Sequence, residues 1–71
     1  MALLPHQERV VVERSELDEK IRSLHDFLAV NRSSESEIAP REMQRLSTQF
    51  HIMCAYSSLL QERIDNFEVP D

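Results

Sequence analysis

A heptad pattern in the second half of the chain strongly limits the folds that it can adopt. Between residues 41 and 67, apolar or small residues recur at alternating steps of three and four positions. The positions are Met43, Leu46, Phe50, Met53, Ser57, Leu60, Ile64 and Phe67. This spacing places them along one side of an α-helix, whereas a β-strand would require alternation at every second residue. The pattern therefore predicts a long amphipathic helix, from about residue 40 to 67, that packs against another helix.

A similar pattern in the first half predicts a matching helix from about residue 5 to 30. Its seam has the same steps and consists of Val10, Arg14, Leu17, Ile21, Leu24 and Leu28. Outside this seam, Asp18 and Arg22 have the spacing of helical neighbours on a solvated face. The apolar period stops between residues 31 and 39, where Ser, Asn and Glu dominate, and Pro40 suits the first turn of the next helix. The sequence thus predicts a single all-α domain over residues 1–71, an antiparallel two-helix hairpin.

The second helix carries more apolar surface than one partner helix can cover. The surplus residues beside its seam are Ile52, Ala55, Tyr56 and Leu59. A chain of 71 residues buries only a modest share of its surface, so a stable monomer would be marginal. We therefore expect the hairpin to assemble with copies of itself into a homo-oligomeric helical bundle, either a dimer of four helices or a larger oligomer.

Composition and charge exclude several classes of function. The chain contains no glycine, so it has no glycine-rich loop for phosphate binding. Its net charge of −5 disfavours direct DNA or RNA binding, which depends on clustered Lys and Arg. All basic residues except Lys20 are nevertheless Arg, the side chain best suited to bidentate contacts with anions. A local site for a small anion is therefore compatible with the acidic chain.

The sequence offers no pattern for catalysis, for a metal or for a cofactor. His6, His25 and His51 are far apart and share no metal-ligand spacing with Cys54, so we expect no zinc site. Cys54 is the only cysteine, which excludes an intrachain disulfide and suggests a reducing compartment. No apolar run is long enough to span a membrane, and the N-terminus lacks a signal-peptide pattern. We expect a cytoplasmic protein that is not an enzyme.

Two polar residues interrupt the seams, Arg14 in the first helix and Ser57 in the second. A turn centred near residue 35 or 36 would place these two residues level with each other. A charged Arg at a seam needs a partner, because burying an unpaired charge is costly. In a structural interpretation, Arg14 meets a carboxylate such as Glu13 or Glu62 and fixes the register of the helices.

In a functional interpretation, the same layer belongs to a ligand site. The candidate ligand-binding residues are Arg14, Tyr56, Ser57, Arg63 and Arg9. Arg and Tyr can stack on a nucleobase, while Arg and Ser can contact phosphate. The residues alone leave both interpretations open, and the structural one is the simpler.

Short motifs in both helices also match a pattern known from other proteins. The first helix reads E-R-V-V from Glu8, then E-L-D-x-K-I from Glu16, then L-x-x-F from Leu24. The second reads M-x-x-Y-S-x-x-L-x-x-R-I-x-x-F from Met53 to Phe67. Together these motifs resemble a widespread group of phage accessory proteins of similar length, mostly hypothetical. The resemblance covers both helices but not the linker, and heptads alone do not explain its Tyr-Ser pair or its Arg.

The resemblance implies an origin in a phage or prophage, and hence a place in the host cytoplasm. Small phage accessory proteins often act against host defence, some by sequestering cyclic nucleotide signals and others by blocking a host protein. The leading hypothesis is a counter-defence protein that sequesters a small anionic cyclic nucleotide in an oligomer. The alternative is an acidic protein-interaction module that inhibits a host defence or regulatory protein, since an acidic face can imitate nucleic acid. A structural phage component is a third class.

Overall fold

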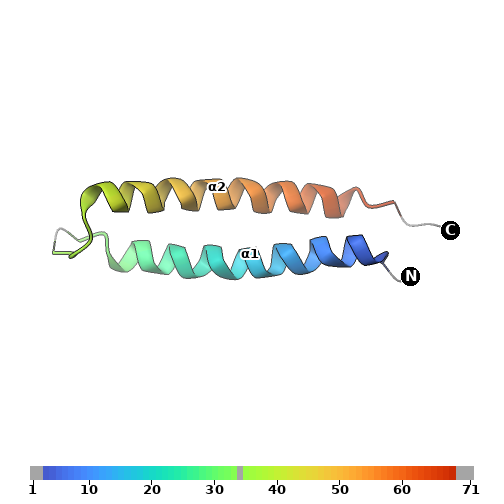
Figure 1. The fold of residues 1–71 in the computed structure, drawn as a ribbon, viewed down its shortest axis with the longest axis horizontal. Coiled ribbons are helices and arrows are strands. Elements are labelled where there is room, and N and C mark those ends of the chain that lie inside the picture. The colour runs from blue at the N-terminus through green and yellow to red at the C-terminus, as the bar shows by residue number, and fades with distance from the viewer. Residues whose placement is uncertain (1–2, 34, 69–71) are drawn as a thin grey trace.

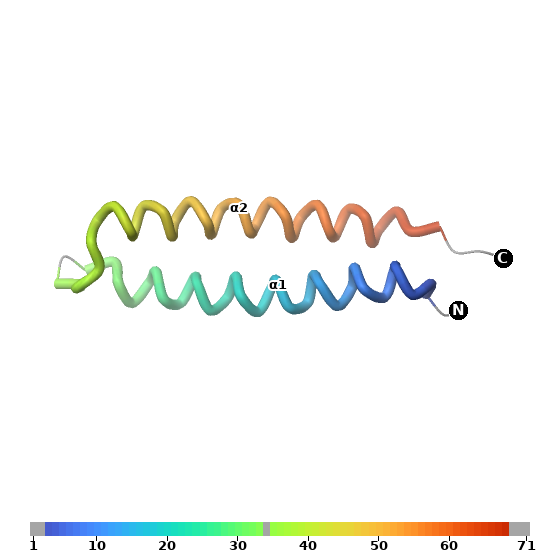
Figure 2. The backbone as a smooth tube through the Cα atoms, viewed as in Figure 1, coloured from blue at the N-terminus to red at the C-terminus, as the bar shows by residue number. Residues whose placement is uncertain are grey.

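The computed structural model describes residues 3–33 and 35–68, and these form two α-helices packed side by side. α1 spans Pro5–Val30 and α2 spans Pro40–Asp65. They run antiparallel, with the start of α1 beside the end of α2 (Figure 1). The backbone trace in Figure 2 shows two nearly straight, parallel axes, and the rod measures 58 × 14 × 13 Å. The described part contains no β-strand, which confirms the all-α class and the packed helix pair.

Local hydrogen bonds explain where α1 begins and ends. Pro5 occupies the first turn, where its missing N–H costs no hydrogen bond. The Leu4 backbone N–H donates to the Gln7 side-chain oxygen at 2.9 Å, which satisfies a donor at the helix entry. At the other end, the Asn31 side chain donates to the Phe27 carbonyl at 2.9 Å, and the helix stops there.

Side chains of the linker, residues 31–39, join the two helix ends. Ser36 Oγ donates to Asn31 Oδ1 at 3.2 Å and accepts a hydrogen bond from the Ile38 backbone N–H, also at 3.2 Å. Ser and Asn are favoured in turns because their short side chains bond to nearby backbone groups. One hydroxyl thus links the end of α1 to the approach to α2.

α2 ends at Asp65, whereas the heptad pattern predicts an end near Phe67. Asn66 leaves the helical conformation, with φ of −109° and ψ of 15°, and its side chain donates to the Glu62 carbonyl at 2.7 Å. Asn competes with the helix ladder through such local bonds. Phe67 is still half-buried, so it continues the apolar spacing without continuing the helix.

The inner seams, meaning the two sets of heptad positions identified in the sequence, meet along the hairpin. Every residue of both seams is buried or half-buried. Leu60 is fully buried and Val10 is 5% exposed, while the other seam residues keep part of their surface in water. The buried core is therefore concentrated at the end where α1 begins and α2 finishes.

A buried polar side chain closes this end of the hairpin. Gln7 is 3% exposed, and its Nε2 donates to the Glu68 carbonyl at 3.0 Å while its Oε1 accepts from Leu4. Both ends of the amide are therefore satisfied, as a buried polar group requires. Gln7 ties the start of α1 to the chain that follows α2, although it lies outside the predicted seam.

We expect Leu60→Ala to lower the free energy of unfolding by about 2–5 kcal/mol, because Leu60 is fully buried and its truncation opens a cavity in the core. Val12→Ala is the control, since Val12 is 53% exposed and its truncation should change stability by no more than about 0.5 kcal/mol. Urea denaturation followed by circular dichroism, at one fixed protein concentration, measures both. Equal effects of the two substitutions would contradict the packing described here.

Candidate functional site

The polar layer predicted at the seam exists, with Asp18 at its centre. Arg14 Nε lies 3.6 Å from Asp18 Oδ2, and both side chains are 37% exposed. Asp18 Oδ1 accepts a hydrogen bond from Ser57 Oγ across the hairpin. Asp18, rather than Glu13 or Glu62, therefore neutralises Arg14. We refer to these three residues as the Arg14 layer.

The two cross-hairpin hydrogen bonds lie on either side of the predicted register. Ser57 bonds to Asp18, which follows Arg14 by one turn, whereas Tyr56 bonds to Glu13, which precedes Arg14. The turn predicted near residue 35 or 36 is compatible with these contacts, and the difference lies in the side chain that Ser57 meets.

Asp18 could not be selected from its spacing alone. It stands four residues after Arg14 and four residues before Arg22, so either ion pair fits a helix. The sequence-based interpretation places Asp18 on the outer face near Arg22, whereas the structure pairs it with Arg14 and turns it toward Ser57. The four-residue spacing between Arg14 and Asp18 is the sequence signal for the observed ion pair. The position of Ser57 on α2 decides whether Asp18 pairs with Arg14 or with Arg22.

Arg14 retains an unused hydrogen-bond donor. Within the described residues, its Nε is buried and has no hydrogen-bond partner, because 3.6 Å to Asp18 is too long for a hydrogen bond. Buried donors are normally satisfied, and a guanidinium presents five N–H groups in a fixed fork. Arg14 also lines a hollow of about 320 Å³, whose other lining residues are Val11, Ser15, Asp18, Glu19, Arg22 and Ile64, so that two Arg side chains balance two carboxylates there. The layer thus contains a cation that can accept an additional oxygen ligand.

Tyr56 makes a separate contact across the hairpin. Its hydroxyl donates to Glu13 Oε2, and its side chain is 40% exposed. This hydrogen bond is the main reason why the pKa of Tyr56 is raised above 10.0, with smaller contributions from desolvation and from the charge of Glu13. The positive charge of Arg63 acts in the opposite direction on the Tyr56 pKa and has the smallest effect of these causes.

The candidate residues therefore form two groups instead of one pocket. Consecutive residues of a helix point about 100° apart, so Tyr56 and Ser57 reach α1 on different sides of the contact. Arg14 joins Ser57 through the shared carboxylate of Asp18, and Arg63 acts on Tyr56 through its charge alone. Arg9 is exposed and its Nε donates to a carbonyl of its own helix at 3.4 Å. Ligand binding by these five residues remains a prediction.

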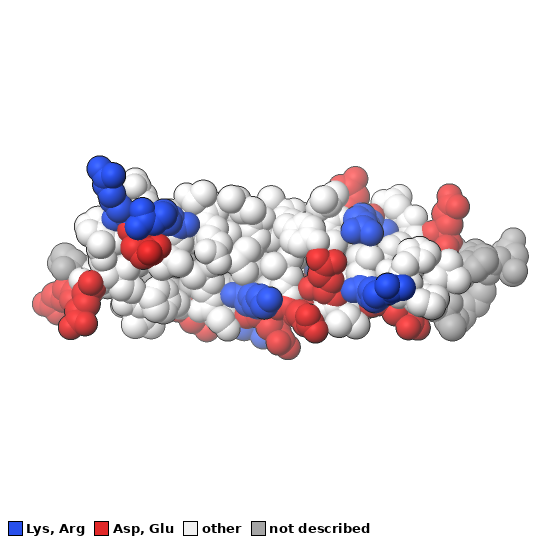
Figure 3. Space-filling model, in the orientation of Figure 1, with Lys and Arg blue, Asp and Glu red and all other residues white. Residues whose placement is uncertain are grey.

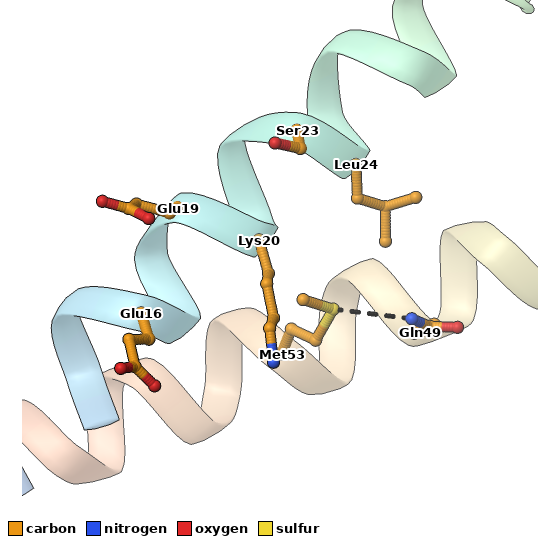
Figure 4. A pocket seen from close by; sticks show the side chains of 7 residues that line it. All are labelled: Glu16, Glu19, Lys20, Ser23, Leu24, Gln49 and Met53. Atoms are coloured by element: carbon orange, nitrogen blue, oxygen red, sulfur yellow. Dashed lines mark hydrogen bonds between the residues drawn. The ribbon is translucent and has the colours of Figure 1, made fainter. Parts of the chain in front are cut away.

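A groove of about 620 Å³ runs between the two helices (Figure 4). It is lined by Glu16, Glu19, Lys20, Ser23, Leu24, Gln49 and Met53. Lys20 extends from α1 toward Met53 of α2, whose sulfur accepts a hydrogen bond from Gln49 Nε2 at 3.8 Å. Two Glu and one Lys give this wall a negative balance, which disfavours an anion there.

A second hollow, of about 550 Å³, lies on the outside of α2. Its lining consists of Arg41, Gln44, Arg45 and Thr48 and contains no carboxylate. Arg45 Nε is 3.5 Å from Glu42 Oε1, at the spacing of helical neighbours. The four-residue spacing of Arg41 and Arg45 is the sequence signal for this basic patch, which the inner seam does not reveal.

Two kinds of site do not occur among residues 3–33 and 35–68. There is no group of three or more His, Cys, Asp or Glu side chains that could hold a metal ion. Neither helix is long and apolar enough to cross a membrane.

The fold and its contacts define a class of protein, a short helical hairpin whose polar groups line the edges of a two-helix seam. A protein-family model with the description Sequestin matches residues 4–66, a span that includes both helices. The chain therefore belongs to the Sequestin family. No curated protein and no solved structure gives a significant match to the chain. The family match covers the same two helices that resemble the small phage accessory proteins.

The Tyr56–Glu13 contact predicts a measurable pH dependence. Tyr56 is the only tyrosine and the chain has no tryptophan, so ultraviolet absorbance reports the ionisation of this one side chain. We expect a pKa above 10.0 in the folded protein and a return toward 10.0 in urea. Since the folded pKa is the higher one, the contact stabilises the fold fully below pH 10.0 and is lost as pH rises through the folded pKa.

Glu13→Gln tests the cause of this shift. It preserves the shape of the side chain but removes its negative charge, so the pKa of Tyr56 should fall toward its ordinary value. Glu16→Gln is the matched control on the same helix, because Glu16 lines the groove and makes no contact with Tyr56 among the described hydrogen bonds. An unchanged Tyr56 titration in Glu13→Gln would show that the negative charge of Glu13 does not raise the Tyr56 pKa, since the Gln side-chain oxygen can still accept the hydrogen bond.

Proposed function

We propose that this protein is a phage counter-defence protein that sequesters a small anionic nucleotide, of the cyclic signalling kind, in a homo-oligomer within the host cytoplasm. The family name Sequestin supports a role in binding, and we propose no catalytic activity. One observation carries the choice of an anion, namely the buried Arg14 Nε that has no hydrogen-bond partner beside a solvent-accessible hollow.

In this proposal, the Arg14 layer binds a phosphate. The Arg14 side chain is 37% exposed although its Nε is buried, so an oxygen ligand would approach it from solvent through the exposed part of the side chain. The Ser57 hydroxyl now donates to Asp18, and rotation about its C–O bond would direct the same proton toward a phosphate oxygen. Asp18 would then serve to hold Arg14 in place, while its own negative charge limits the affinity.

In the proposed oligomer, the Tyr56 group of a neighbouring copy supplies a surface for a nucleobase, because the two groups lie on different sides of one hairpin. The ring is 40% exposed, and its hydroxyl is fixed by Glu13, so little side-chain entropy is lost when a base stacks on it. Arg63, whose positive charge acts on the Tyr56 hydroxyl, would add a cation beside the stacked base. Arg9 is exposed at the same end of α1 and is the remaining candidate for a phosphate contact.

The alternative function is that of an acidic protein-interaction module that inhibits a host defence or regulatory protein. The net charge of −5 supports it, since each further copy in an oligomer adds to the negative field. A thermal-shift screen of cyclic di- and trinucleotides separates the two functions, because a tight ligand raises the melting temperature by mass action. No shift with any nucleotide, together with a host protein captured from lysate, would favour the alternative.

Arg14→Leu should fold normally but lose binding of the nucleotide selected by the screen. Replacing a partly buried charge with an apolar side chain is often neutral or stabilising. Loss of a charge-assisted contact costs about 1.5–3 kcal/mol, which is more than about tenfold in affinity. Isothermal titration calorimetry measures the change, with Arg32→Leu in the exposed linker as the control. Wild-type affinity in Arg14→Leu would remove the Arg14 layer from the site.

Tyr56→Ala should weaken the same binding by about 1–3 kcal/mol if the base stacks on the ring. Tyr56→Phe is the informative control, because it retains the ring and removes only the hydrogen bond to Glu13. We expect Tyr56→Phe to bind nearly as well as the wild type in the same calorimetric titration. Equal losses in both variants would assign the effect to the hydroxyl and would contradict stacking.

A further inference from the structure

The middle of α2 lacks charge on all its sides, although the hairpin covers only one of them. From Leu46 to Gln61 the helix contains no Asp, Glu, Lys or Arg, whereas the charges of α1 are spread along most of its length. Figure 3 shows this as a white central band on α2, with blue and red side chains gathered toward its two ends. Ile52 is 64% exposed and Leu59 is 51% exposed within this band. Contact with α1 does not explain why these outward positions are uncharged.

The exposed side of α2 contains a second heptad seam. Its positions again alternate in steps of three and four, and all of them are exposed in the hairpin. We call the following set the outer seam: Arg45, Thr48, Ile52, Ala55, Leu59 and Glu62. Such a seam is the pattern by which one helix packs against another. The outer seam is therefore suited to a further helix, and its sequence determines which one.

The two ends of the outer seam carry opposite charges. A parallel pair of these helices would place Arg45 against Arg45 and Glu62 against Glu62, which is unfavourable at both ends. An antiparallel pair places Arg45 of each copy against Glu62 of the other. Between these end layers, Thr48 meets Leu59 and Ile52 meets Ala55, so that a large side chain faces a smaller one in every layer. The seam is thus complementary to itself only in the antiparallel orientation.

We propose that a second copy of this chain docks on the outer seam of α2, antiparallel and related by a two-fold axis between the Ile52 and Ala55 layers. A two-fold interface requires such self-complementarity, because the same patch is used by both copies. The hollow lined by Arg41 and Arg45 contains no carboxylate, and it is the place that Glu62 of the second copy would enter. Arg45 is 66% exposed beside Glu42, so its guanidinium has N–H groups free for that contact.

The same pairing extends the proposed ligand site. Tyr56 follows the outer-seam residue Ala55, and Gln49 follows Thr48 on the same flank. In an antiparallel pair equal flanks face each other, so Gln49 of the second copy comes beside Tyr56. The role of Gln49 beside Tyr56 in ligand binding rests on the proposed function. The interface itself rests only on the proposal that the chain forms an oligomer, and it is tested without a ligand.

Sedimentation equilibrium of the ligand-free protein, over a range of micromolar concentrations, tests the interface. We expect the wild type to dimerise, and Arg45→Glu or Glu62→Arg alone to raise the dimer Kd by about tenfold or more, because each creates two like-charge layers. The double variant R45E/E62R restores opposite charges in both layers and should recover dimerisation. Arg32→Glu, the same charge change in the exposed linker, should leave the dimer intact.

The outcomes separate this interface from the rest of the proposal. Circular dichroism first verifies that each variant keeps its helix content. Recovery of dimerisation in the double variant would show that the single substitutions act on the interface and not on folding. A monomeric wild type would overturn the interface and the oligomeric part of the proposed function together. A wild-type oligomer that is unaffected by the single variants, or not restored in the double variant, would overturn only the antiparallel outer-seam contact. In either case, nucleotide binding by one chain would still be decided separately by calorimetry.

Discussion

Each helix of a two-helix hairpin can bury only one of its faces, and the remaining organisation of this protein follows from that limit. Among residues 3–33 and 35–68, Leu60 is the one fully buried large side chain, and Val10 is the only other apolar residue that is nearly enclosed. The rest of the inner seams is half-buried, so hydrophobic burial per chain is small. Polar contacts at the edges of the seam consequently contribute to holding the helices in register. The apolar side chains on the outside of α2 stay exposed and can pack against a further helix.

The edge contacts show how a narrow seam accommodates polar groups. Glu13 and Asp18 both belong to α1, and each accepts one hydroxyl hydrogen bond from α2. The two donors, Tyr56 and Ser57, are consecutive residues. Because these consecutive residues diverge by about 100°, one contact lies on each side of the seam. The two carboxylates thus fix the rotation of α2 as well as its position along α1. Gln7 acts similarly at the end of the rod, where its amide bonds to Leu4 and Glu68.

The heptad spacing was sufficient to predict the fold, while the layer of polar contacts depended on details that spacing does not contain. Apolar steps of three and four residues identify the buried side of each helix, because burial selects side chains by their position around the axis. They do not determine which polar side chains meet at the edge of the seam, because Arg14 and Asp18 stand one turn apart on the same side of α1. Ser57 bonds to Asp18 and not to Arg14, while Tyr56 bonds to Glu13. The polar residues were therefore predicted on the correct helices, but their pairing was not.

A chain with a net charge of −5 can still bind a small anion, because charge acts differently at short and at long range. Exposed charges are screened within about 8 Å at physiological salt, so carboxylates at the far end of a 58 Å rod contribute little at Arg14. A long nucleic acid would run along many of these carboxylates and be repelled, whereas a ligand of one or two nucleotides meets only the donors near it. For the proposed ligand the local balance matters, and at Arg14 it is one guanidinium against the carboxylate of Asp18. This pair is close to neutral, so a phosphate that reached Arg14 would share the guanidinium with a carboxylate already in place. The proposed site would therefore favour small anions over polyanions, because it depends on local charges alone.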